Sequence, residues 1–323
     1  MKTLVTGAGG FIASHLVEEL VRQGHEVRAF VHYNSRSYWG WLEDSPCRDS
    51  VEIIAGDVRD YDLVKSTVAG CGTVFHLAAL IGIPYSYVSP LAYIRTNVEG
   101  TYNVLQAARE CGAERVIHTS TSEIYGTAQY VPIDEAHPVN PQSPYAASKA
   151  SADFLALSYH RSFGLPVTVV RPFNTYGPRQ SARAIIPTVI SQILDGRDTL
   201  SLGNLAPTRD LTFVSDTVSG FLAAADSHET VGETVNLGTG SEISIGDLVA
   251  KIARIMGREV RIVSDEQRVR PTKSEVERLL SDPGKMRSLT GWLAKVSLDD
   301  GLARTVEWMK ERRSLYKSDI YNV

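Results

Sequence analysis

Residues 6–13 read T-G-A-G-G-F-I-A, and this stretch decides the fold. The residues before it, 2–6, predict a short buried strand, and those after it, 12–23, have helical periodicity. A glycine-rich turn that follows a strand and opens a helix is the setting in which such a pattern indicates dinucleotide binding. The first turn of the chain therefore predicts a dinucleotide site.

Each small residue of this turn has its own expected role. Gly7 allows the tight turn, Gly10 lets the backbone approach a pyrophosphate, and Ala13 lets the helix lie close to the strand. The helix, which begins near Phe11 and Ile12, would present its N-terminus to the phosphates. The alternative is a tight strand–helix turn that binds no ligand.

Strands and helices alternate over the first half of the chain. We expect further strands at 27–31, 51–55, 73–77, 115–119 and 166–171, and helices at 60–69, 91–111 and 145–163. This alternation predicts an α/β fold with a doubly wound parallel (Rossmann) sheet covered on both faces. After residue 175 the elements become shorter and mixed. We therefore predict a dinucleotide-binding domain at 1–175, with later segments threaded back onto it, and a smaller mixed α/β substrate-binding domain at 176–323.

The composition is that of an ordinary globular protein. The chain has 323 residues, 43% hydrophobic and 22% charged, with a net charge of −4, so we expect no nucleic-acid or membrane partner. No apolar run reaches the roughly 18 residues of a membrane span. Three cysteines without a C-x-x-C pair predict free thiols in the cytoplasm, and the histidines lack the spacing of metal ligands.

Two motifs carry the predicted chemistry, T-S-E at 121–123 and Y-A-A-S-K at 145–149. Tyr145 and Lys149 lie four residues apart, on one face of a helix, and the ammonium would favour the phenolate. Glu123 would be a second base in the same cleft. Ser122 would donate a proton, position a water or only cap the strand end. Taken alone, the pair could also be a surface tyrosine and a solvated lysine, and Glu123 an ordinary surface carboxylate.

The end of the second strand bears on the choice between NAD and NADP. NAD-preferring folds usually place an acidic residue there, whereas this chain reads V-H-Y-N-S-R at 31–36. Asn34 and Arg36 could receive a 2′-phosphate, which favours NADP slightly, although Arg36 could simply lie on a solvated loop. Asp57 and Val58 follow the third strand, where an adenine would lie; Asp57 could instead cap a loop.

Arginines of the second half are candidates for binding a diphosphate, because guanidinium groups pair bidentately with phosphate oxygens. The three candidates are Arg179, Arg209 and Arg270, each beside a proline or a polar turn. Any one of them could equally be a surface salt-bridge partner. As a group they favour an anionic substrate.

With these residues in hand, the chain resembles the extended short-chain dehydrogenases/reductases of the nucleotide-sugar epimerase/dehydratase family. The resemblance runs from T-G-A-G-G-F-I through H-L-A-A at 76–79, the two catalytic motifs and F-N-T-Y-G-P-R at 173–179, to L-T-G-W at 289–292. Within the family, W-G-W-L at 39–42, G-T-A-Q-Y-V-P-I-D-E at 126–135 and the segment 174–184 are most like UDP-N-acetylglucosamine 4,6-dehydratases of the legionaminic-acid pathway.

The resemblance implies a role for each motif residue. Tyr145 would take the proton of the sugar 4-hydroxyl, Lys149 would lower its pKa, Thr121 would bind the 4-oxygen, and Glu123 would remove the C5 proton. The predicted cofactor-binding residues, besides Tyr145 and Lys149, are Gly7, Gly10, Phe11, Ile12, Asn34, Arg36, Asp57, Val58, Leu77, Ala78, Ala79 and Asn97. The predicted substrate-binding residues are Asn174, Arg179, Arg209 and Arg270.

The expected activity is C4 oxidation, elimination of water across C5 and C6, and hydride return to C6, with NAD(P) retained through turnover. The substrate would be a nucleotide-diphosphate sugar, and relatives imply a homodimer. Ser122 departs from the dTDP-glucose dehydratases, which carry Asp there, so the acid that expels the 6-hydroxyl stays open. The alternatives are a UDP-glucuronate decarboxylase, a 4-epimerase and, outside enzymes, a dinucleotide-sensing regulator.

Overall fold

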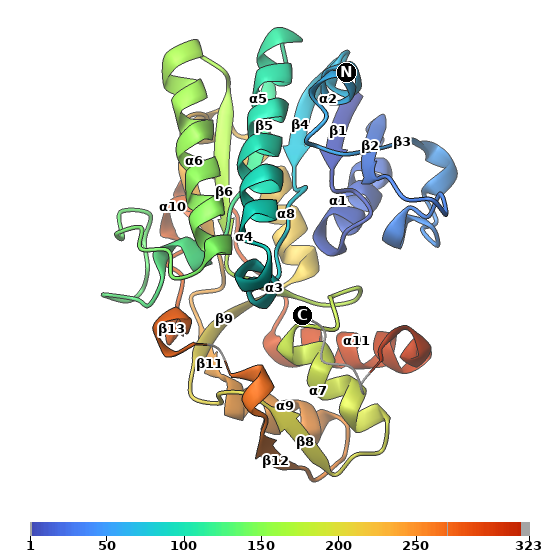
Figure 1. Cartoon of the computed structure of the whole chain (residues 1–323), viewed down its shortest axis with the longest axis vertical. Coiled ribbons are helices and arrows are strands. Elements are labelled where there is room, and N and C mark those ends of the chain that lie inside the picture. The colour runs from blue at the N-terminus through green and yellow to red at the C-terminus, as the bar shows by residue number, and fades with distance from the viewer. Residues whose placement is uncertain (1, 270, 318–323) are drawn as a thin grey trace.

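The computed structural model describes residues 2–269 and 271–317, and a seven-stranded parallel sheet forms its centre (Figure 1). The order of the strands is β10-β6-β5-β4-β1-β2-β3. Their bounds are β1 (Lys2–Thr6), β2 (Val27–His32), β3 (Val51–Gly56), β4 (Cys71–His76), β5 (Arg115–Thr119), β6 (Val167–Pro172) and β10 (Thr234–Leu237). The predicted doubly wound parallel sheet is thereby confirmed.

Helices cover both faces of this sheet, because the strands are apolar on both sides. On one face α1 (Phe11–Arg22) packs against α8 (Val214–Asp226). On the other lie α2 (Tyr61–Val68), α5 (Gly100–Glu110) and α6 (Pro144–Phe163). Two separate clusters of buried apolar side chains fill the two interfaces, so the sheet is a fixed platform between them.

The second half of the chain forms smaller sheets beside the carboxyl ends of the central strands (Figure 1). One sheet contains β7 (Asn174–Tyr176), β9 (Thr208–Phe213), β11 (Glu242–Ser244) and β13 (Arg278–Leu279), and the other pairs β8 (Thr199–Leu202) with β12 (Arg261–Ser264). The helices are α7 (Ile185–Leu194), α9 (Ile245–Ile255), α10 (Gly284–Thr290) and α11 (Leu298–Glu311). However, β10 and α8 belong to the central sheet and its layers; the division at residues 175 and 176 stays a prediction.

The direction of strand order reverses beside β1, whose neighbours are β2 on one side and β4 on the other. In open α/β sheets ligands bind in the crevice outside the carboxyl ends of the strands at such a point. The glycine turn follows β1 directly, so the topology places it at this crevice.

The helix predicted at 91–111 is present, but it contains a π-helical segment that the sequence pattern did not indicate. The structure has α3 (Ile83–Val88), a short α4 (Pro90–Tyr93), a π-helical segment η3 (Ile94–Glu99) and then α5. A π-helical turn adds one residue per turn, which rotates the side chains within it relative to the helix on either side. The rotation turns Asn97 into the interior, where it is fully buried.

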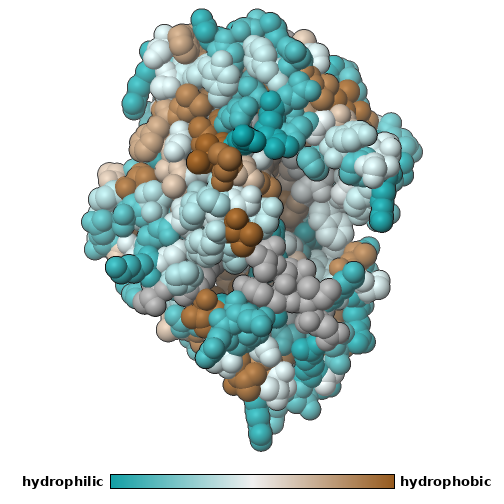
Figure 2. All heavy atoms as spheres, viewed as in Figure 1, coloured by the Kyte–Doolittle hydropathy of each residue, from teal (hydrophilic) through white to brown (hydrophobic). Residues whose placement is uncertain are grey.

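The surface over these helices is unusually apolar. Exposed large apolar side chains on α3 to α6 are Val88, Leu91, Ile94, Tyr102, Phe154 and Phe163. Figure 2 shows brown, hydrophobic atoms among the hydrophilic ones on the face where α5 and α6 lie in Figure 1. None of the helices described is long and apolar enough to cross a bilayer.

Candidate active site

The turn after β1 packs tightly against the end of β4, the neighbouring strand of the central sheet. Gly7 has φ +68°, and a Cβ there would lie 2.8 Å from the Cα of Ala78. The Thr6 hydroxyl accepts hydrogen bonds from the backbone N–H groups of Leu77 and Ala78, at 3.2 and 3.1 Å. Only glycine fits this position, because the backbone is left-handed and the neighbouring strand end leaves no room.

The N-terminus of α1 is open to an anion. Its cap is Gly10, which supplies no side-chain acceptor, and its first turn has no acidic residue. The N-terminal N–H groups and the helix dipole are therefore free to meet negative charge. Gly10 and Phe11 line a cavity of about 350 Å³ together with Ile81, Arg179 and Arg183. These features fit the pyrophosphate of a dinucleotide.

The loop after β2 offers one available cation. The side chain of Asn34 bonds the backbone of its own loop, including the Tyr38 carbonyl at 2.6 Å and the Arg36 N–H at 3.1 Å, and its contact with a cofactor stays a prediction. The Arg36 side chain forms no salt bridge within residues 2–269 and 271–317. The NADP interpretation therefore depends on Arg36, and it stays a prediction.

The predicted adenine residues after β3 are held by their neighbours. Asp57 accepts hydrogen bonds from the backbone N and the Nε of Arg59, both at 2.9 Å, so it does cap its loop. The carbonyl of Val58 accepts from Asn103, at 2.9 Å, and its side chain packs against Gly100. An adenine contact by either residue stays a prediction.

Asn97 acts on the site through the backbone of another segment. Its side chain accepts from the Leu80 N–H at 2.8 Å and donates to the Leu80 carbonyl at 3.0 Å. It also donates to the Ser148 hydroxyl on α6, at 2.9 Å. Asn97 thus ties the segment after β4, which includes Ala79, to the helix that carries the catalytic motif.

The catalytic helix α6 starts with Ser143 as its N-cap, which accepts from the Ala146 N–H, and with Pro144 in the first turn. Tyr145 and Lys149 point into the protein and are only 7% and 3% exposed. The Nζ of Lys149 donates to the Thr119 carbonyl at 2.5 Å. Burial lowers the pKa of Lys149 to about 8, because the charged form loses its hydration.

The T-S-E motif meets Tyr145 at the end of β5. Thr121 caps the short helix η4 (Ser122–Tyr125) and its side chain hydrogen-bonds the Tyr145 phenol. Burial is the main cause that raises the pKa of Tyr145, and the negative charge of Glu123 adds to it, whereas the Thr121 hydrogen bond lowers it. The structure therefore brings together Thr121, Glu123 and Tyr145, with Ser122 buried beside them.

Two of the substrate-binding candidates, Arg179 and Arg209, are held by partners within the protein. Arg179 is bound to α1, through Glu18 Oε1 at 2.7 Å and Ser14 Oγ at 3.1 Å, which weighs against a diphosphate role. Arg209 donates to the Thr208 carbonyl and pairs with Glu275 at 3.4 Å. Arg270 lies outside the described residues. Asn174 has a buried Oδ1 without a hydrogen-bond partner in the described structure, as a ligand-binding amide would.

Two residues were missing from the sequence prediction, Tyr93 beside Tyr145 and Arg183 beside Tyr93. The ring of Tyr93 stands edge-on to that of Tyr145, with centroids 6.2 Å apart, and its hydroxyl donates to the Gly82 carbonyl. Arg183 also lies beside Gly82, where an added Cβ would collide with its guanidinium and come near the Tyr93 hydroxyl. No sequence spacing links these residues to Tyr145, since they come from separate segments.

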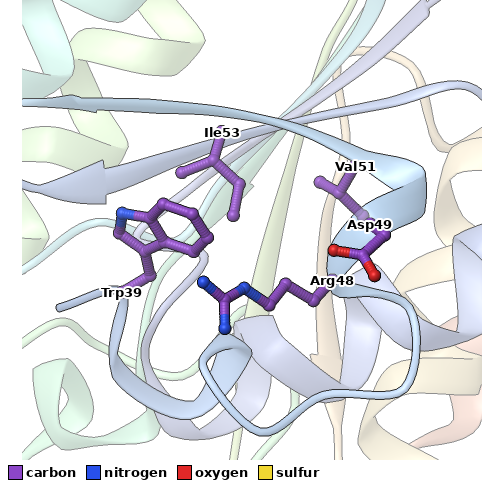
Figure 3. A pocket seen from close by; sticks show the side chains of 5 residues that line it. All are labelled: Trp39, Arg48, Asp49, Val51 and Ile53. Atoms are coloured by element: carbon purple, nitrogen blue, oxygen red, sulfur yellow. The ribbon is translucent and has the colours of Figure 1, made fainter. Parts of the chain in front are cut away.

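A second cavity, of about 340 Å³, lies away from this chemistry at the outer edge of the sheet (Figure 3). Val51 and Ile53 of β3 line it, and the guanidinium of Arg48 points toward the ring of Trp39, 4.6 Å from its centroid. None of the predicted site residues borders it, so we assign it no part in the reaction.

Comparison with known proteins identifies the family. The family model described as GDP-mannose 4,6 dehydratase matches residues 4–305. A dTDP-glucose 4,6-dehydratase of Streptomyces antibioticus is 34% identical over 98% of this chain and 95% of its own length. A UDP-glucose 4-epimerase of Mycolicibacterium smegmatis is 35% identical, over 97% of this chain and 99% of the relative.

A solved structure leads to the same family. The dTDP-glucose 4,6-dehydratase DesIV of Streptomyces venezuelae, determined with NAD and TYD bound, superposes with a TM-score of 0.88. It is 34% identical, and the match covers 98% of this chain and 99% of that one. The chain is therefore an enzyme of the GDP-mannose 4,6-dehydratase family, which belongs to the NAD-dependent nucleotide-sugar epimerases and dehydratases.

Proposed function

We propose that this enzyme is a nucleotide-sugar 4,6-dehydratase, a lyase that forms a 4-keto-6-deoxy sugar nucleotide. The observation that carries the proposal is Glu123, a carboxylate close enough to Tyr145 to raise its pKa. Oxidation at C4 alone needs one base, whereas elimination of water across C5 and C6 needs a second. The paired bases thus favour dehydration.

In this proposal Tyr145 accepts the proton of the sugar 4-hydroxyl, and Thr121 holds the 4-oxygen through the hydroxyl that now binds the phenol. Bound NAD(P) would supply the oxidation at C4 and the later reduction at C6. Protonated Lys149, fixed on the Thr119 carbonyl, favours the phenolate through its charge. Burial and the negative charge of Glu123 both raise the pKa of Tyr145, so a nearby positive charge is needed to favour the phenolate.

Glu123 then removes the C5 proton, which a ketone at C4 makes acidic, and water leaves from C6. Thr121 and Glu123 already have roles in this proposal, so Ser122, buried next to Glu123, is the side chain of the motif that could assist the departing hydroxyl. A serine is a far weaker acid than a carboxyl group. We therefore propose that Ser122 positions a water that protonates the departing hydroxyl, and that Glu123, protonated by the C5 hydrogen, exchanges this proton with solvent before it reprotonates C5.

We propose UDP-N-acetylglucosamine as the substrate. Support comes from the segments 39–42, 126–135 and 174–184, which resemble the UDP-N-acetylglucosamine 4,6-dehydratases. The relatives reported above act by name on dTDP-glucose and UDP-glucose. Asn174, with its unpartnered oxygen, is the proposed contact to the nucleotide portion; Arg209 and Arg270 stay predicted diphosphate contacts.

The second candidate is a 4-epimerase, favoured by the UDP-glucose 4-epimerase that is 35% identical. An epimerase would use Tyr145, Lys149 and Thr121 in the same way. It would leave Glu123 without a function, and for that reason we place it second.

Four sugar nucleotides distinguish these possibilities: UDP-N-acetylglucosamine, dTDP-glucose, UDP-glucose and UDP-glucuronate. Each is incubated separately with the purified protein, and the products are examined by mass spectrometry and NMR. Loss of one water from UDP-N-acetylglucosamine supports the full proposal, and loss from dTDP-glucose only would replace the substrate. Unchanged mass with inverted C4 would establish the epimerase. Loss of CO₂ from UDP-glucuronate would establish a decarboxylase, and inactivity on all four would favour a regulator.

We also propose a cofactor, an oligomeric state and a cellular location. The cofactor is NAD or NADP and stays bound through turnover; NAD is present in the solved Streptomyces venezuelae relative. The apolar surface on α3 to α6 supports a homodimer. A cytoplasmic location stays a prediction.

A further inference from the structure

A third ionisable residue continues the row formed by Tyr145 and Lys149. Asp153 follows Lys149 by four residues on α6, so the three side chains point to the same side of the helix. Asp153 is 1% exposed, which is exceptional for a carboxylate. The proposed reaction gives it no role.

The contacts of Asp153 lie at the carboxyl ends of β5 and β6. Its Oδ2 accepts from Ser120 Oγ at 2.7 Å and from Arg171 Nε at 3.1 Å, and its Oδ1 lies 3.3 Å from His118 Nε2. Lys149 is bound to Thr119, the residue before Ser120. Two successive turns of α6 are therefore fastened to two successive residues that lead directly into Thr121 and Glu123.

The charges of this buried cluster balance only with Asp153. Lys149 interacts electrostatically with His76 from β4, His118 from β5 and Asp153 from α6. Asp153 also interacts with Arg171 from β6 and with Tyr145 from α6, Arg171 with Tyr125 from η4, and Tyr145 with Glu123 from η4. Burial lowers the pKa of both histidines from 6.5, so both are neutral at pH 7. Lys149 and Arg171 then stand as two buried cations, with Asp153 as the carboxylate between them. Without it, two like charges would share a site of low polarity.

We propose that Asp153 is a positioning residue of the active site: it keeps Lys149 charged and holds Thr121 and Glu123 in register with Tyr145. The catalytic part of this inference rests on the proposed function. The electrostatic part, the coupling between Asp153 and Lys149, does not, and it can be measured without substrate.

The kinetic test compares the pH profile of sugar-nucleotide turnover in the wild type, D153N, D153E and S120A. In D153N the fall in kcat at alkaline pH begins on the order of one pH unit lower, because Lys149 loses its proton more easily. D153E keeps the charge and S120A removes only a hydrogen bond, so both keep the alkaline limb of the wild type. An alkaline limb in D153N that coincides with that of the wild type overturns the proposal.

The substrate-free test measures the melting temperature of the same proteins between pH 6.5 and 9. The pKa of Lys149 falls from 10.5 in the unfolded chain to about 8 when folded. Above a pH of about 8 the unfolded state therefore binds more protons than the folded state, so stability rises as the pH increases beyond the folded pKa of Lys149, and this gain is lost as the pH falls back to that pKa. D153N moves the rise of the melting temperature to lower pH. In a K149M background, which lacks the titrating ammonium, D153N does not change the pH dependence in this way.

D216N is the matched control for loss of a buried carboxylate. Asp216 accepts from the backbone of Lys295 and Val296, far from α6, so D216N lowers the melting temperature without moving the rise. If the melting temperature rises over the same pH range in D153N, D216N and the wild type, the coupling between Asp153 and Lys149 is overturned. The wild type could be inactive on every sugar nucleotide while D153N still shifts the pH at which the melting temperature rises. That result would overturn the proposed function but not the coupling between Asp153 and Lys149.

Discussion

Tyr145 is a buried phenol whose pKa is raised by its surroundings, so its reactivity depends on its contacts. We predict that Y145F lowers turnover by about 10²–10⁴-fold, because the acceptor of the 4-hydroxyl proton is lost. The fold should persist, since the contact between the two rings of Tyr93 and residue 145 needs no hydroxyl. Rates of product formation and the circular dichroism spectrum measure the two effects.

Y130F is the control for this variant, since the Tyr130 hydroxyl also forms one hydrogen bond, to Asp134 at 2.7 Å, on the surface. It should retain wild-type turnover. Activity of Y145F within threefold of that of the wild type would exclude Tyr145 as the base.

Glu123 separates the dehydratase from the epimerase. We predict that E123Q lowers water elimination by about 10²–10⁴-fold but still oxidises C4, because the amide cannot accept the C5 proton whereas Tyr145 is intact. Mass spectrometry follows the loss of water, and nicotinamide absorbance follows the oxidation. E114Q, at an exposed position, is the control. Wild-type water loss in E123Q would contradict this role.

At the scale of elements, the glycine turn that follows β1 packs tightly against the segment that follows β4. Alanine in a left-handed conformation costs about 1–2 kcal/mol. We predict that G7A suffers this cost plus the collision with Ala78, and is purified with less bound dinucleotide. G24A, at φ +85° with no atom within 4 Å of its Cβ, should show the first effect only. Absorbance spectra and melting temperatures measure both; equal cofactor content in the two variants would contradict the account.

The helical elements show what a sequence pattern can and cannot predict. The spacing of Tyr145 and Lys149 predicted their common face because α6 is regular. The same rule applied to 91–111 missed η3, since a π-helical turn depends on tertiary contacts such as those of Asn97 with Leu80. The spacing rule would also have found Asp153, eight residues beyond Tyr145.

Long-range contacts decide the surroundings of residues that sequence spacing could not predict. Arg179 carries a guanidinium group, as phosphate ligands often do. In the structure this group pairs with Glu18, which lies 161 positions earlier and so could not be identified from local sequence. Tyr93 approaches Tyr145, and Arg183 approaches Tyr93, only after folding. The return of β10 to the central sheet likewise follows from its pairing with β6, which no local periodicity contains.

At the scale of the whole molecule, the apolar side chains on α3 to α6 are where the proposed homodimer would form. Phe154, on α6, is 59% exposed. We predict that F154E dissociates a dimer into monomers, because a buried carboxylate would be unpaired in the interface. V263E on β12, where Val263 is 45% exposed, should remain dimeric. Sedimentation velocity measures the mass; a monomeric wild type would exclude the dimer.

The central claim is that one site oxidises C4 and then eliminates water with Glu123 as the base. Its most direct test is mass spectrometry of the product formed from UDP-N-acetylglucosamine in D₂O. The account predicts loss of one water and gain of one non-exchangeable deuterium at C5, which E123Q abolishes. A product of unchanged mass apart from exchangeable positions, or water loss without deuterium at C5, would contradict it.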